Sequence, residues 1–186
     1  MSEKLVPGTV LPFTGNDGMF AMFRPMIAAA NGLSLSQVCA ITGLERSTVQ
    51  NWIKRGFVAH PVQKKYFSRQ LARILLIGAL RDCMNIDRIG ELMHMVNGSA
   101  DDESDDIISE EQMYDYLCEA IRRMEHGDVS RVRAEQVIAE VTADYTPNGE
   151  KAAERLQTAL LVLVYGYLSG KLKRESEACF EQMKTI

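Results

Sequence analysis

The sequence predicts a mainly α-helical protein, with a compact helical domain at residues 34–98 and a helical bundle at residues 109–186. Three observations predict this fold class. Apolar residues recur at i, i+3 and i+4 through most of the chain, capping residues precede these stretches, and glycine or proline follows them. A chain of 186 residues, 46% of them hydrophobic, can bury a core without disulfides or a metal. The sequence therefore indicates a globular protein rather than a disordered one.

Residues 34–55 predict two short helices joined by a tight turn. The first helix, 34–43, has an apolar stripe and ends at Gly43, which releases the chain into the turn. In the second helix, 46–55, Val49, Trp52 and Ile53 recur at core spacing, so Trp52 is interpreted as a core residue. The opposite side carries hydroxyl, amide and cationic groups: Ser47, Gln50, Asn51, Lys54 and Arg55. This division is typical of a helix-turn-helix whose second helix enters a major groove.

The residues after Gly56 predict a short β-wing followed by two further helices. Phe57-Val58 and Tyr66-Phe67 are expected to pair as two short strands around a turn at His60-Pro61. The wing would carry Gln63, Lys64 and Lys65. A helix at 69–83, capped by Ser68, and another at 88–96, opened by Asp87, complete the predicted domain.

These residues also carry a resemblance. LSQVCAITGLERSTVQNWIKRGFV, residues 35–58, resembles the winged helix-turn-helix of MerR-type bacterial transcription regulators, and YFSRQL, residues 66–71, is similar to the start of that domain's third helix. VQNWIKRGFV, residues 49–58, more closely resembles a Firmicutes family catalogued only as a domain of unknown function. The resemblance covers residues 34–98 well and the remainder loosely.

The MerR-like resemblance implies that Ser47, Gln50 and Asn51 contact DNA bases and that Lys64 and Lys65 of the wing contact phosphates. We also predict phosphate contacts at Lys54, Arg55 and Arg69, because they are cations expected to face the DNA. The sequence departs from the MerR pattern in three ways. Its wing is shorter, and Glu45 stands where a Ser, Thr or Asp usually caps the second helix. The metal-binding cysteine loop is missing. The four cysteines have no zinc spacing, so no metal and no cofactor are predicted.

Charge is distributed unevenly along the chain. The formal net charge is −4, yet residues 34–98 carry nine Lys/Arg against four Asp/Glu, and residues 99–126 carry two against ten. Residues 99–108 are interpreted as an acidic linker, and residues 1–33 as an N-terminal extension that packs on the domain through its Met and Phe residues.

The C-terminal region is predicted to be a helical dimerisation or sensing domain. Helices are expected at 109–126, opened by the capping-box pair Ser109 and Gln112, at 130–145, and at 150–183. Residues 159–168 are apolar on every side except at the glycine, so this stretch needs cover on more than one face. A second copy of the chain or the N-terminal domain would supply that cover, and a homodimer is the expected state.

The expected function is that of a cytoplasmic, double-stranded DNA-binding transcriptional regulator. We expect no membrane partner, since no apolar run approaches the length of a membrane span, and we name no effector. We also expect no enzymatic activity, because the chain has no recognisable catalytic triad, phosphate-binding loop or paired-carboxylate site. The alternative is a protein–protein adaptor whose helix-turn-helix binds a protein. In that case the acidic segment would bind a partner or inhibit the chain's own helix-turn-helix. Retention on heparin at low salt discriminates between the two.

Overall fold

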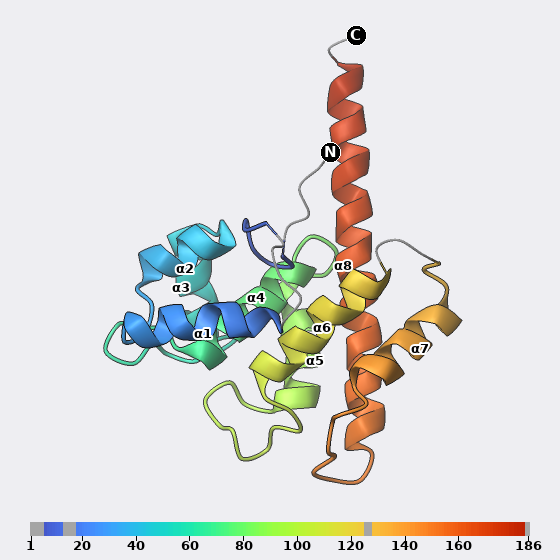
Figure 1. Cartoon of the computed structure of the whole chain (residues 1–186). Helices are drawn as coiled ribbons and strands as arrows, with labels where there is room; N and C mark the ends of the chain where they lie inside the picture. The colour runs from blue at the N-terminus through green and yellow to red at the C-terminus, as the bar shows by residue number, and fades with distance from the viewer. Residues whose placement is uncertain (1–5, 13–17, 125–127, 185–186) are drawn as a thin grey trace.

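The computed structural model describes residues 6–12, 18–124 and 128–184, and over these residues the chain is helical, with no β-strand (Figure 1). The mainly α-helical fold class is therefore confirmed. The helices are α1 (Met19–Ala29), α2 (Leu35–Thr42), α3 (Arg46–Lys54), α4 (Ser68–Leu80), α5 (Ile86–Asn97), α6 (Glu110–Met124), α7 (Arg131–Val141) and α8 (Ala152–Met183).

Helix α4 forms the centre of the molecule. Ten of its residues are buried, and helices α1, α2, α5, α6 and α8 all pack against it. Helix α6 in turn contacts α1, α7 and α8. The hydrophobic core consequently runs without a break from the region of residues 34–98 into the helices after residue 109. Figure 1 shows α1, α2 and α3 gathered on one side of α4, with α7 and α8 on the other.

The apolar patch near the N-terminus forms α1, which contacts α4 and α6. Phe20 and Phe23 are completely buried, and the Phe20 ring packs edge-on against Tyr114 of α6 at 6.2 Å between centroids. Pro25 lies within the helix and removes one backbone donor, yet the helix continues through it. Burial of the aromatic side chains therefore outweighs the local cost of the proline.

Two helices begin earlier than expected, because other residues cap them. The backbone N–H of Phe67 donates to the side-chain oxygen of Gln70 at 2.7 Å, so Ser68 is the first residue of α4 and not its cap. Helix α5 is capped by Asn85, whose side-chain oxygen accepts from the N–H of Arg88 at 3.0 Å, and Asp87 lies inside the first turn. The predicted end of α6 at His126 lies outside the described residues.

The predicted pairing in the wing is wrong. Tyr66 pairs with Leu33, which precedes the N-cap of α2, and not with the residues after α3. Gln63 and Lys64 have positive φ angles of 50° and 65°, so they form a tight two-residue turn closed by the bridge between Val62 and Lys65. Pro61, which has no N–H to donate, precedes this bridge. The wing is therefore a turn and not a two-stranded hairpin.

The apolar stretch of α8 is covered within the chain. Helices α4, α5, α6 and α7 all pack against α8, and they bury its residues from Ala152 to Gly170 on one side. Past Gly170 the helix leaves the body of the molecule (Figure 1). Leu172, Phe180 and Met183 on this extension are 71%, 58% and 71% exposed. Over the described residues, we find no helix that combines the length and the apolar character of a membrane span.

Candidate nucleic-acid interface

Helices α2 and α3 are joined by a turn that the local sequence specifies. The hydroxyl of Ser34 accepts from the N–H of Gln37, which begins α2 with a capping box. Gly43 ends α2 with a positive φ of 68°, and its N–H donates to the carbonyl of Cys39 at 2.8 Å. The side chain of Leu44 is buried in the turn. This tight connection fixes the angle at which α3 leaves α2.

The polar side of α3 is exposed, as the amphipathic pattern predicts. Ser47, Gln50, Asn51 and Lys54, which we call the α3 face, are spaced at i, i+3, i+4 and i+7 and are all exposed. The opposite side is anchored in the core by Val49, Trp52 and Ile53, of which Trp52 is 5% exposed. The predicted base contacts therefore lie together on one helix surface that the described part of the chain leaves open.

Arg55 follows the α3 face directly and is held by two contacts. Its guanidinium donates to the Asp87 carboxylate at 2.5 Å and lies 4.7 Å from the centre of the Phe57 ring. Both charged groups of this pair are substantially exposed. Because an exposed ion pair contributes at most about 1 kcal/mol, Arg55 can exchange Asp87 for another anion at low cost.

The two lysines of the turn differ in their surroundings. Lys64 is exposed at the tip. The Lys65 ammonium instead donates to the backbone carbonyls of Ala30 and Gly32, at 3.2 and 3.1 Å. Lys65 thus fastens the turn to the end of α1, and its charge is directed into the molecule.

Arg69 lies in a network formed with the acidic segment. Its guanidinium pairs with Glu110 at 2.8 Å, Glu103 at 3.1 Å and Asp106 at 3.3 Å, and it donates to the carbonyl of Asp102 at 2.8 Å. Residues 99–106 therefore fold back onto the start of α4. The network occupies the Arg69 guanidinium, and the sequence did not predict it.

A buried ion pair adjoins this network. Arg73 of α4 and Glu110 at the start of α6 are 2.8 Å apart, with side chains 5% and 1% exposed. Arg73 also donates to the backbone carbonyl of Phe57, at 2.8 Å. One guanidinium therefore connects the segment after α3 with the start of α6. The position of Arg73 among apolar residues of α4 signals a buried cation, but nothing in the local sequence indicates its partner.

Asp106 titrates unusually in these surroundings. Burial of its carboxyl group, followed by the nearby charge of Glu110, raises the pKa of Asp106 to about 6, while Arg69 and a hydrogen bond from Asn97 act in the opposite direction. The unfolded-state pKa is near 3.8. Between these two values the folded protein binds more protons than the unfolded chain, so this group favours folding at low pH and loses that effect as pH rises through about 6.

Replacing Asp106 by Asn is therefore expected to stabilise the protein at pH 8, by on the order of 1 kcal/mol once partial solvent screening is allowed for. The gain should shrink as pH falls through 6 and disappear near pH 4. Urea unfolding at a series of pH values measures it. Asp101→Asn, an exposed position of the same segment, is the matched control and should change little at any pH. A difference in stability between Asp106→Asn and the wild type that does not change with pH would contradict the raised pKa of Asp106.

The start of α3 is weakly capped. Among the described residues, no side-chain hydrogen bond caps this helix, whose N-cap is Glu45. We expect Glu45→Ser to raise the free energy of unfolding by about 0.5 kcal/mol, because a hydroxyl can accept from the first free N–H groups. Glu45→Gln removes the same charge without supplying a short capping oxygen and should not stabilise. Urea unfolding of both variants measures this, and equal stabilities would contradict the capping argument.

Comparison with known proteins places the α3 face inside a recognised sequence unit. Residues 29–117 match the model of a family described as a domain of unknown function, DUF1836. This match covers just under half of the chain and runs from the end of α1 into α6. The unit therefore includes α2, α3 and α4 together with the acidic segment and Glu110.

One curated relative is also similar. The uncharacterized protein YkrK of Bacillus subtilis (strain 168) is 27% identical over 105 residues, which are 54% of this chain and 45% of YkrK. The chain thus spans less than half the length of this relative. No solved structure matches the chain.

Proposed function

We propose that the protein is a sequence-specific double-stranded DNA-binding regulator that places the α3 face in the major groove. The observation that carries the proposal is the α3 face itself: amide, hydroxyl and ammonium groups exposed at helical spacing on a short helix anchored by a buried tryptophan. Asn and Gln can pair bidentately with adenine, and α2 with its glycine turn holds α3 at a fixed angle. Such a regulator acts in the cytoplasm.

In this proposal Ser47, Gln50 and Asn51 read bases, while Lys54, Arg55 and Lys64 bind phosphates. The turn at Gln63–Lys64 takes the place of the MerR-like wing. Lys65 and Arg69 are not carried over as phosphate contacts, because both are engaged inside the molecule. Their role in the proposal is to hold the turn and the acidic segment in place.

We propose further that the regulator is a homodimer. The support comes from the exposed extension of α8, whose apolar side chains Leu172, Phe180 and Met183 are each more than half exposed. The apolar stretch before Gly170 does not require a second copy, because other helices of the same chain cover it. A two-fold dimer would read a site with two related half-sites in successive major grooves.

The experiment that tests the function is selection from a random duplex library by the purified protein at two salt concentrations. An enriched motif with two half-sites, bound less tightly at higher salt, is the expected result. A folded protein that enriches no motif would overturn the proposal and favour a protein adaptor. The adaptor alternative has one observation in its support: the acidic segment occupies Arg69 at the start of α4, where a basic DNA-binding surface would otherwise extend.

A further inference from the structure

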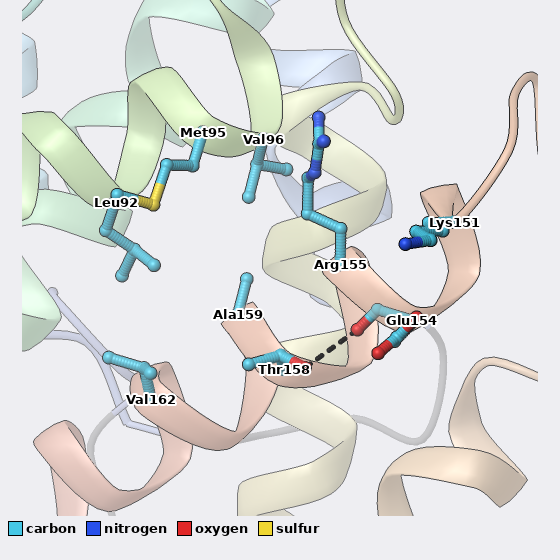
Figure 2. A pocket seen from close by; sticks show the side chains of 9 residues that line it. All are labelled: Leu92, Met95, Val96, Lys151, Glu154, Arg155, Thr158, Ala159 and Val162. Atoms are coloured by element: carbon cyan, nitrogen blue, oxygen red, sulfur yellow. Dashed lines mark hydrogen bonds between the residues drawn. The ribbon is translucent and has the colours of Figure 1, made fainter.

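An open groove of about 350 Å³ lies between α5 and α8, and none of the residues of the α3 face lines it (Figure 2). This volume falls at the lower end of the range of small-molecule sites, roughly 300 to 1,000 Å³. Helix α5 contributes three lining side chains, and α8 with its N-cap contributes six: Leu92, Met95 and Val96, and Lys151, Glu154, Arg155, Thr158, Ala159 and Val162.

Most of the groove is apolar. Figure 2 shows Leu92 and Val162 facing each other at one end, with Met95, Val96 and Ala159 between the two helices. Met95 is 62% exposed although it lies beside this apolar floor. A flexible thioether side chain at the edge of a groove can move to cover an apolar ligand. The groove therefore offers an apolar surface to a chain-like group.

The other end of the groove is cationic. Lys151 and Arg155 lie there, and Figure 2 shows the Arg155 side chain extending from α8 toward α5. Among the described residues, neither side chain has an ion-pair or hydrogen-bond partner. Glu154 lies at the same end, and the Thr158 hydroxyl is already used, since it donates to the Glu154 backbone carbonyl at 2.8 Å. Two cations against one carboxylate give this end a net positive charge.

We propose that the groove binds a small amphipathic anion: a monocarboxylate with an unbranched apolar tail. The tail would lie along Leu92, Val96 and Val162 and remove their apolar surface from water. The carboxylate would accept charge-assisted hydrogen bonds from the Arg155 guanidinium, with Lys151 beside it. The site is independent of DNA binding, so either proposal can fail without the other.

The test uses the full-length protein and three probes of equal chain length. Sodium octanoate is titrated by calorimetry, and octanol and octylammonium serve as the neutral and cationic analogues. Saturable binding of octanoate, with at least tenfold weaker binding of the other two, is expected from the charge-assisted hydrogen bonds. The Met95 methyl resonance, in protein labelled at its methionine methyl groups and assigned with a Met95→Leu variant, should shift along the same titration.

Three variants at the groove and two controls elsewhere locate the site. Arg155→Gln should weaken octanoate binding about tenfold and Lys151→Gln by a smaller factor, whereas Lys184→Gln, at the opposite end of α8, should not change it. Val162→Phe, which fills the groove, should abolish binding, while Val132→Phe, at an exposed position of α7, should leave it intact. Equal binding of octanol, wild-type affinity in Arg155→Gln, or a Val162→Phe protein that still binds would each overturn the proposal. A wild-type dimer that only Val162→Phe dissociates would assign the groove to a second copy instead.

Discussion

Replacing Glu110 by Gln is expected to lower the free energy of unfolding by about 3–5 kcal/mol. The substitution keeps the size of the side chain but removes the counter-ion of Arg73, whose guanidinium is almost fully buried. Arg69 loses a carboxylate as well. An uncompensated charge in a core costs far more than the pair itself contributes, because its desolvation is no longer offset. Urea unfolding followed by circular dichroism measures the loss.

The control lies on the same helix. Glu119 of α6 pairs with Arg122 and Arg123, at 2.7 and 2.6 Å, but near the surface. Glu119→Gln should therefore cost at most about 1 kcal/mol. The double variant Arg73→Met with Glu110→Leu should be less destabilised than Glu110→Gln alone, because no unpaired charge remains. A Glu110→Gln protein as stable as Glu119→Gln would show that Arg73 finds another partner or water.

The helices could be predicted because their signals are local. Ser34, Gly43 and Ser109 stand where capping chemistry requires them, and the apolar spacing in α3 gives the correct buried and exposed sides. The same local reasoning placed the start of α5 at Asp87, although Asn85, two residues earlier, supplies the capping oxygen. Errors of this size arise because several neighbouring residues can act as caps.

The long-range pairings could not be predicted from the sequence. Tyr66, which follows α2 and α3 in the sequence, pairs through its backbone with Leu33, which precedes them. The Arg73 side chain pairs with Glu110, 37 residues further along the chain. The second pairing depends on how α4 packs against α6, and the first depends on how the segment before α2 meets the segment before α4; no local pattern encodes either. Residues 99–108 read as a linker from their composition, yet Arg69 binds several of them.

The second large effect concerns the proposed DNA interface. The triple variant Lys54→Gln, Arg55→Gln and Lys64→Gln should lower affinity for all duplexes about 500-fold at 0.1 M salt. Each phosphate contact releases close to one counter-ion, which contributes about 0.9 to the slope of log K against log salt concentration. Three contacts should therefore reduce that slope by about 2.7. Fluorescence anisotropy with a labelled duplex over a series of salt concentrations measures both quantities.

A charge-matched control separates this local effect from the change in net charge. Replacing Arg122, Arg131 and Lys151 by Gln removes three exposed cations from α6, α7 and the N-cap of α8, far from the α3 face in sequence and off the α8 extension. That variant should bind within a few-fold of the wild type and keep its salt slope. Asn51→Ala should differ from both, because loss of a base contact weakens the preferred site by about 1–3 kcal/mol and leaves other sequences unchanged. Equal losses in the two triple variants would mean that DNA responds only to total charge, and the α3 face would then have no specific role.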